Sequence, residues 1–255
     1  MRFRPCIDIH NGAVKQIVGG TLNDRSTSET KENFVSDKDA AFFAALYRER
    51  DLPGGHVILL NPKDSPYYEA TKEQALGALR AYPGGLQAGG GITPENAADF
   101  LDAGASHVIV TSYVFREGRI EEKNLEKMAA SVGKDRLVLD LSCRLKNDRY
   151  YIVTDRWQRF TDVELTAGLL SELSGACNEF LVHAADVEGK QAGIEEEAVR
   201  ILASSPVPAT YAGGIRNLSD VEKIRELGLG KVDFTVGSAL DLFGGALPFE
   251  TVARK

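Results

Sequence analysis

The sequence reads AGGGI at residues 88–92 and repeats this segment as AGGI at residues 212–215. Each segment precedes an apolar run that ends in small residues, VIVTS at 108–112 and FTVGS at 234–238. The glycine segments are separated by 124 positions and the TS and GS pairs by 126. An aspartate in the contexts CIDIH and VLDLS recurs after 132 positions. Near-constant offsets of three features in one order indicate two similar halves.

Eight apolar runs have the length and composition of buried β-strands. They cover residues 4–9, 56–60, 86–88, 107–110, 137–141, 179–183, 207–211 and 231–236. Amphipathic segments between them, such as 37–51, 93–104 and 218–228, predict helices. In the second of these segments, Thr93 is the expected N-cap and Gly104 the expected end.

Eight strand-then-helix units in 255 residues predict an α/β fold, a (β/α)8 barrel with a half-barrel internal repeat. We expect a single domain over residues 1–255, with half-barrels of approximately 1–132 and 133–255. The alternative is a doubly wound open sheet. That fold would favour a single glycine-rich turn after the first strand, and the sequence has none there.

The composition argues against several classes of protein. No apolar run approaches the roughly 18–20 residues of a membrane span, and MRFRPCIDIH lacks the apolar core of a secretory signal. We therefore expect a cytoplasmic protein, or a plastid protein if a transit peptide has been removed. A net charge of −7 argues against nucleic acid as a partner, and we expect a monomer. Three cysteines without C-x-x-C spacing argue against a disulfide framework or a zinc site.

Two groups of small residues are candidate phosphate sites. In a barrel of this kind the active site lies at the carboxyl ends of the strands, where paired glycines let backbone N–H groups approach an anion. The second cradle, after strands 7 and 8, consists of Gly213, Gly214, Gly237 and Ser238. The first cradle, half a barrel away, consists of Gly90, Gly91, Thr111 and Ser112. Two cradles imply a ligand with a phosphate at each end; tight turns without a ligand are the alternative.

Asp8 and Asp140 occupy equivalent places in the two halves, at the ends of strands 1 and 5. Two carboxylates that flank a bound sugar can act as general base and general acid if their environments separate their pKa values. Magnesium binding by the pair is the minor alternative. Cys6 is expected to fill the barrel, and His10 to share the strand face of Asp8.

Other candidate ligand contacts are single residues outside the repeated segments. His183 ends strand 6 and precedes a polar, glycine-containing loop on the same face. Trp157 lies in the polar insert 142–161, where an aromatic ring can stack on a heterocycle or pack on the barrel. Lys15 and Lys190 lie outside the strands, so a phosphate or sugar contact, or plain solvation, is expected rather than a Schiff base.

Several segments together resemble a known family. They are FRPCIDIHNGAVKQIVGGTL, GGLQAGGGIT, SHVIVTSYVF, RLVLDLSCR, TDRWQRFTD, FLVHAADVEGK, TYAGGI and VDFTVGSALDLFGG. The chain resembles, from Arg4 to about Gly245, the histidine-biosynthesis isomerases that act on phosphoribosylformimino-aminoimidazole carboxamide ribotide. It is most similar to the eukaryotic-type branch of that family, whose substrate carries two phosphates.

The resemblance implies an Amadori rearrangement of an aminoaldose to an aminoketose, with no metal and no organic cofactor. It implies Asp8 as the general base at C2 and Asp140 as the general acid that opens the ribose ring. Trp157 matches the family's aromatic residue in a loop that closes over the substrate. Many bacterial members carry threonine where this chain has Ala184, and Asp186 would supply a polar contact instead.

Two other functions remain open. The related cyclase subunit of imidazole glycerol phosphate synthase shares the paired aspartates and both cradles, but HAADVEGK and TYAGGI resemble the isomerase. A barrel that binds a phosphosugar without catalysis is the second alternative, and the presence of both Asp8 and Asp140 speaks against it.

Overall fold

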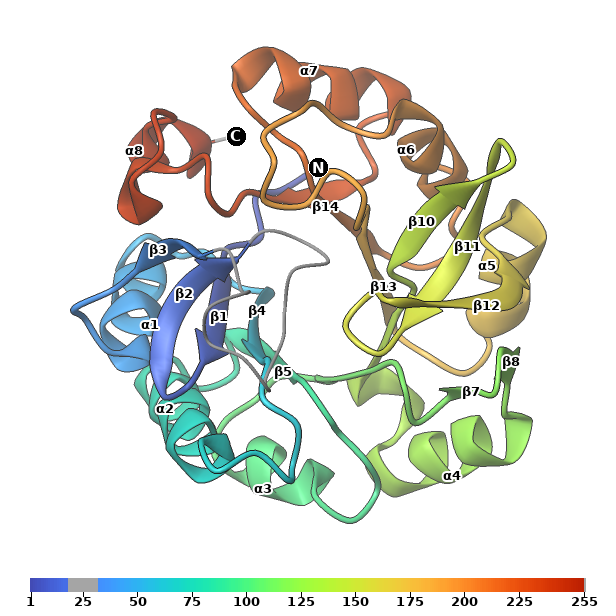
Figure 1. Ribbon diagram of the computed structural model, residues 1–255, viewed down its shortest axis with the longest axis horizontal. Helices are drawn as coiled ribbons and strands as arrows, with labels where there is room; N and C mark the ends of the chain where they lie inside the picture. Colours follow the sequence, from blue (N-terminus) through green and yellow to red (C-terminus); the bar gives the residue numbers. More distant parts are fainter. Residues whose placement is uncertain (18–31, 255) are drawn as a thin grey trace.

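The computed structural model describes residues 1–17 and 32–254, and it contains a barrel of eight parallel strands (Figure 1). The barrel strands are β1 (Cys6–His10), β4 (Gly55–Leu59), β5 (Leu86–Gly89), β6 (Val108–Val110), β9 (Leu137–Asp140), β13 (Glu179–His183), β14 (Ala209–Ala212) and β15 (Asp233–Thr235). A parallel bridge between Phe3 and Phe234 closes the barrel, with Arg4 N donating to Phe234 O at 2.8 Å. The predicted (β/α)8 barrel is confirmed; the domain boundaries stay a prediction.

Helices surround the barrel on its outside (Figure 1). They are α1 (Ala40–Glu49), α2 (Tyr68–Ala81), α3 (Ala97–Asp102), α4 (Glu122–Val132), α5 (Ala167–Leu173), α6 (Glu196–Leu202), α7 (Leu218–Leu227) and α8 (Phe249–Val252), with 3-10 turns η1 (Lys134–Arg136) and η2 (Asp241–Phe243). Within the described ranges, no helix has the length and apolar character needed to cross a bilayer.

One predicted helix start is wrong: α3 begins at Ala97 and not directly after Thr93. The side chain of Asn96 accepts the Thr93 N–H at 2.7 Å and donates to the Gly91 carbonyl at 3.1 Å. Residues 94–96 form a turn in which the N–H groups of Asn96 and Ala97 donate to the Thr93 carbonyl, and the Asn96 side chain adds its bonds to this turn. This turn ties the start of α3 to the first cradle.

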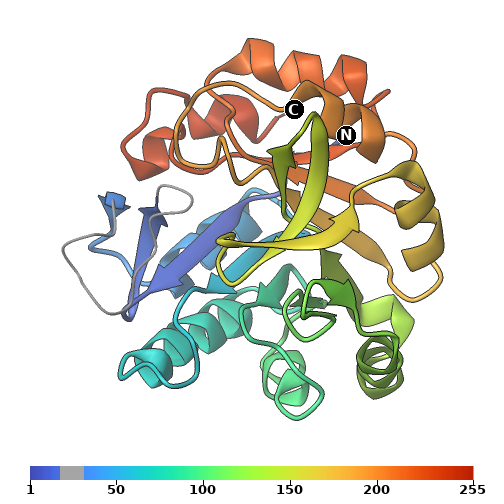
Figure 2. The same cartoon turned by 45° about the vertical axis from the view of Figure 1, so that its right-hand side comes forward.

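Antiparallel strands extend from the carboxyl end of the barrel. The strands β2 (Ala13–Ile17) and β3 (Glu32–Val35) continue from β1, and β7 (Phe115–Arg116) pairs with β8 (Arg119–Ile120). The insert predicted at 142–161 forms a sheet of β10 (Cys143–Lys146), β11 (Arg149–Thr154) and β12 (Arg159–Glu164) (Figure 2). The part of the first family-like segment at 18–22 lies outside the described residues.

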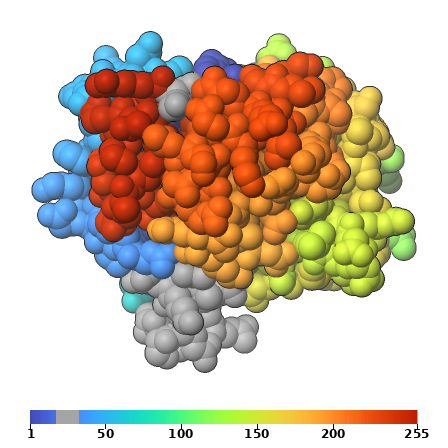
Figure 3. Space-filling model, turned by 90° about the horizontal axis from the view of Figure 1, so that it is seen from above, coloured from blue at the N-terminus to red at the C-terminus, as the bar shows by residue number. Residues whose placement is uncertain are grey.

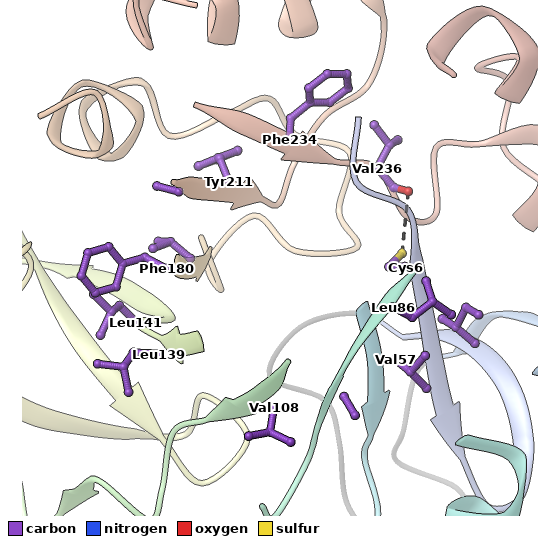
Figure 4. Close-up of a cluster of buried hydrophobic side chains, with 14 of the residues drawn as sticks. Cys6, Val57, Leu86, Val108, Leu139, Leu141, Phe180, Tyr211, Phe234 and Val236 are labelled. Atoms are coloured by element: carbon purple, nitrogen blue, oxygen red, sulfur yellow. Dashed lines mark hydrogen bonds between the residues drawn. The ribbon is translucent and has the colours of Figure 1, made fainter. Parts of the chain in front are cut away.

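Two hydrophobic cores form on the two faces of the barrel wall. The larger core lies between strands and helices and contains Val57, Leu139, Phe180, Tyr211 and Phe234, which come from five different strands (Figure 4). The smaller core lies on the opposite face of the strands, inside the barrel. It consists of Ile109, Val138 and Leu181, with Ile58 packed against them.

Helices α1 and α8, from opposite ends of the chain, lie side by side (Figure 3). The rings of Tyr47 and Phe249 are 6.1 Å apart, and those of Phe43 and Phe243 are 5.6 Å apart. On the surface above them, Arg50 donates two hydrogen bonds to Glu250. These contacts join the last strand–helix unit to the first.

A buried ionic network fills the amino-terminal end of the barrel. Arg4 Nε donates to Asp233 at 2.7 Å, and its Nη2 lies 3.5 Å from Glu179. Gln87 and Thr210 each donate to Glu179 at 3.1 Å. Because Arg4 is shared by two carboxylates from two strands, it links the start of the chain to the far side of the barrel.

The Arg4→Met variant should lower the free energy of unfolding by about 3–5 kcal/mol, because it removes the buried cation that Glu179 and Asp233 share. Arg50→Met is the matched control: it removes an ion pair between exposed side chains and should move the urea midpoint little. Equilibrium urea denaturation measures both variants. Equal midpoints for the two would contradict the assigned role of Arg4.

Candidate active site

The predicted acids lie at the carboxyl-terminal mouth of the barrel. Asp8 lies on β1, Asp140 ends β9, and His183 ends β13. Asp8 and His183 line one cavity together with Cys6, His56 and the loop after β13. All four residues of the second cradle also line this cavity: Gly213, Gly214, Gly237 and Ser238.

Asp8 is held in an environment that favours its protonated form. Burial, together with the nearby charge of Glu188, raises the pKa of Asp8 to about 7, although the charge of His183 and a bond from Gln16 act in the other direction. That bond, from Gln16 Nε2 to Asp8 Oδ2, is long at 3.5 Å. A carboxyl group with a pKa near neutrality can accept and return a proton at physiological pH.

Asp140 is held in the opposite state. Burial acts to raise its pKa, but His183 and the donors of Ser142 outweigh burial and lower it. Ser142 donates from N at 2.8 Å and from Oγ at 2.5 Å to Asp140 Oδ1, and Thr111 Oγ1 donates to Oδ2 at 3.1 Å. These donors favour the ionised form of Asp140, and its role as general acid stays a prediction.

His183 interacts with the carboxyl groups of both Asp8 and Asp140. Burial lowers its pKa, but the carboxylates of Asp140, Glu188 and Asp8 raise it to a value above that of an ordinary histidine. Its Nδ1 lies 4.0 Å from Asp140 Oδ1. The ring of Trp157 lies 5.4 Å from that of His183, and whether it stacks on a ligand stays a prediction.

Glu188 was not singled out by the sequence analysis. It lies in the loop after β13, lines the cavity, and has its pKa raised by burial, against the charge of His183 and the N–H of Gly189. Two carboxyl groups with raised pKa values, Asp8 and Glu188, therefore face the same cavity. The only signal in the sequence was the Glu-Gly pair in a loop already assigned to the catalytic face.

Other predicted contacts have partners within the protein. Asp186 accepts Arg144 Nε at 2.8 Å and the Leu145 N–H at 2.9 Å, so it attaches β10 to the loop after β13. Lys190 Nζ donates to the carbonyl of Asp186 at 2.6 Å. Lys15 is buried on β2. Whether these side chains contact a ligand stays a prediction.

The remaining expectations of the sequence concern three buried side chains. Cys6 lines the cavity and donates a weak bond to Val236 O at 3.8 Å, and His10 lies buried at the end of β1. Ala184 forms a parallel bridge with Cys143, so the position that differs from the bacterial pattern is a backbone anchor for β10.

The repeated glycines have the same backbone conformation. Gly90 and Gly91 have φ of 104° and 68°, and Gly213 and Gly214 have φ of 121° and 72°. A Cβ on Gly90 would lie 2.1 Å from the carbonyl oxygen of Leu59, and one on Gly213 would lie 2.9 Å from that of Ala184. Close approach to the end of the preceding strand therefore explains part of the repeat without any ligand.

The two cradles differ in their surroundings. The second cradle opens on the cavity, whereas the first does not contribute to it. In the first cradle the hydroxyl of Thr111 is directed to Asp140, and Ser112 is exposed. Phosphate binding by either cradle stays a prediction, and the structure favours the second.

Comparisons with known proteins agree with this architecture. Residues 2–247 match the family model described as "Histidine biosynthesis protein". Relatives from Medicago truncatula, Neurospora crassa and Saccharomyces cerevisiae are 53%, 51% and 45% identical. The alignments cover 99%, 96% and 99% of this chain and 80%, 93% and 97% of the relatives. Each relative is named a 1-(5-phosphoribosyl)-5-((5-phosphoribosylamino)methylideneamino)imidazole-4-carboxamide isomerase, and the Medicago protein is named chloroplastic.

The cradles can be tested with substitutions whose side chains clash with no backbone atom, although a side chain at Gly91 carries the strain of a positive φ. Gly91→Asp is suitable because a Cβ there meets nothing within 4 Å, and at Gly237 it meets only the side-chain end of Gln16. Both variants should weaken binding of the relatives' bis-phosphoribosyl compound about 30- to 100-fold by repelling phosphate, as measured by calorimetry.

The matched control for Gly91→Asp is Gly230→Asp, since Gly230 has a φ of 67° and equally open space. It carries the same backbone cost and the same added charge at a site remote from the mouth. If Gly91→Asp binds the compound as well as Gly230→Asp does, the first cradle holds no phosphate.

Proposed function

Because the chain belongs to the histidine biosynthesis protein family, we propose that it is the isomerase that its relatives are named for. The reaction is an aldose–ketose (Amadori) isomerisation, in which the 5-phosphoribosylamino group of the carboxamide ribotide becomes a phosphoribulosylamino group. The observation that supports it in the structure is a cavity that holds two carboxyl groups of raised pKa beside a glycine cradle.

The chemistry needs one acid and one base. A proton delivered to the ribose ring oxygen breaks the C1–O bond, and the nitrogen lone pair forms a C1=N bond. A base then removes the C2 proton to give an enaminol. Loss of the hydroxyl proton at C2 and protonation at C1 give the ketone. The product has the composition of the substrate, so the electrons balance without an external oxidant or reductant.

The carboxyl groups of the cavity suit these two tasks. We assign the base at C2 to Asp8, whose pKa of about 7 makes it half ionised at neutral pH. We assign the acid to Glu188 rather than to Asp140, because the pKa of Glu188 is raised and that of Asp140 is lowered. Asp140 remains essential in this scheme as the fixed negative charge beside His183.

The family and the two cradles also support a ligand that carries two phosphates. A compound with two phosphoribosyl groups has a phosphate at each end, which fits two cradles on opposite sides of the mouth. We propose a monomer that acts on this small molecule in the cytoplasm or in a plastid, since the Medicago relative is named chloroplastic. The cyclase alternative is not favoured, because the relatives are named as isomerases.

The decisive experiment is turnover by the purified protein. Incubation with the formimino carboxamide ribotide should yield the ribulosyl product, identified by chromatography and mass spectrometry. Phosphoribosylanthranilate as a second substrate measures the breadth of specificity. A folded protein that binds the ribotide without converting it would be a phosphosugar-binding barrel and not an isomerase.

Asp8→Asn and Glu188→Gln should each lower kcat by about 10²- to 10⁴-fold, because each removes one proton-transfer group. In the unaltered enzyme, kcat/KM should rise with pH up to about 7 as Asp8 ionises. The loss of the Glu188 proton should lower kcat/KM, at a pH above that at which an ordinary glutamate ionises. A pH profile of Glu188→Gln that keeps this fall would remove Glu188 from the role of acid.

Asp8→Asn should also stabilise the protein at pH 8. An ordinary aspartate has a pKa of 3.8, and the folded protein raises the pKa of Asp8 to about 7, so ionisation destabilises the folded state as pH rises between these values. Removing the charge should therefore raise the free energy of unfolding by roughly 2 kcal/mol at pH 8, about half of the full shift, and by little at pH 4.

Thermal denaturation at the two pH values measures this difference. Asp37→Asn, which neutralises an exposed aspartate, is the control and should change the melting temperature little at either pH. An unchanged melting temperature of Asp8→Asn at pH 8 would contradict the raised pKa of Asp8.

A further inference from the structure

Ser142 links Asp140 to His183. It is completely buried, two residues after the end of β9. Its Oγ lies 2.5 Å from Asp140 Oδ1 and 3.3 Å from His183 Nδ1. A hydroxyl has one proton, and the ionised Asp140 can only accept, so the Ser142 proton points to Asp140. The oxygen of Ser142 can then only accept from His183, which places a hydrogen on Nδ1.

The link is rigid on both sides. The backbone N–H of Ser142 also donates to Asp140, and Val153 of β11 donates to the Ser142 carbonyl at 2.8 Å. The second oxygen of Asp140 is held by Thr111. The orientation of the Ser142 hydroxyl is thus set by neighbours from β6, β9 and the insert sheet.

We propose that Ser142 is a positioning residue, which donates to Asp140, accepts the His183 Nδ1–H and leaves Nε2 to bind an oxygen of the phosphosugar in the cavity. The inference rests on the proposed isomerase function. In its charged form His183 donates a hydrogen bond from Nε2 to the C2 oxygen, where negative charge develops as Asp8 removes the C2 proton. No proton is transferred from the histidine, so the balance of the reaction is unchanged.

The groups around His183 are consistent with this charged form. Asp8 faces it from β1, Asp140 from β9 and Glu188 from the following loop, and all three raise its pKa. His56 on β4 has its ring 5.6 Å away, and burial together with the charge of His183 lowers the pKa of His56 to about 3. His56 is therefore neutral at pH 7 and adds no positive charge beside His183.

The test is NMR titration of the imidazole groups in the protein without substrate. The chain has four histidines, so the resonance of His183 can be assigned by a His183→Gln variant. Ser142→Ala should lower the pKa of His183 by about one unit, the worth of one charge-assisted hydrogen bond. It should also shift the neutral tautomer from Nδ1–H toward Nε2–H. Ser142→Thr, which keeps the hydroxyl, should restore both.

Thr161→Val is the matched control. It removes another buried hydroxyl, which donates to the Ile152 carbonyl within the insert sheet, and should leave the titration of His183 unchanged. If Ser142→Ala does not fold, Asp140→Asn keeps the shape of the site and should lower the same pKa. An unaltered pKa and tautomer of His183 in the folded variant would overturn the proposal.

Steady-state kinetics supply the second measurement. In Ser142→Ala, kcat should fall about 10- to 100-fold with KM within about threefold, because the lost contact forms in the transition state. A changed tautomer with normal kcat would overturn the catalytic part. A changed tautomer in a protein without any isomerase activity would instead refute the proposed function and leave the link between Ser142 and His183 intact.

Discussion

The mouth of the barrel is organised around His183, whose pKa is raised, against the effect of burial, by three carboxyl groups. Asp8, Asp140 and Glu188 face this histidine from three segments, and buried carboxylates are costly unless a cation or hydrogen-bond donors accompany them. The protein gives its strongest donors, both from Ser142, to Asp140, which is therefore the acid that stays ionised. Asp8 and Glu188 receive fewer donors and hold their protons to higher pH. The unequal number of hydrogen-bond donors to the carboxyl groups that face His183 thus gives these groups different pKa values, and with them different tasks.

The rest of the barrel keeps this arrangement in place. Arg4 joins two carboxylates at the amino-terminal end, and aliphatic side chains such as Val138 and Leu181 fill the interior between that network and the site. Because the site raises the pKa of Asp8, it destabilises the folded protein at neutral pH. Stability must then come from elsewhere, and the packed core outside the strands together with the ionic network can supply it.

The features that depend on a local pattern of residues could be predicted from the sequence. All eight strands were found, because buried parallel strands are short and continuously apolar, and Asp8 and Asp140 were found because they interrupt such runs. Ser142 and Glu188 were missed as functional residues. Their roles depend on contacts between loops that are distant in the chain, and a serine or glutamate in a loop has no periodicity to mark it. The bonds that Asp186 accepts from Arg144 and Leu145 of β10 also join distant segments and could not be read from the sequence, and its contact with a ligand stays a prediction.

The repeat that revealed the fold also shows where the two halves differ. Thr111 and Gly237 are separated by nearly the same offset as the two glycine segments, and each follows a strand that neighbours the strand of one aspartate. Thr111 donates its hydroxyl to Asp140, whereas glycine at 237 has no hydroxyl to give to Asp8. Among the described residues, the donor to Asp8 is Gln16 at 3.5 Å, a contact too long to hold the pKa down. The two halves therefore share the backbone geometry but not the hydroxyl, so that burial raises the pKa of Asp8 with little opposition from hydrogen-bond donors, and this gives one aspartate the basicity that the reaction needs.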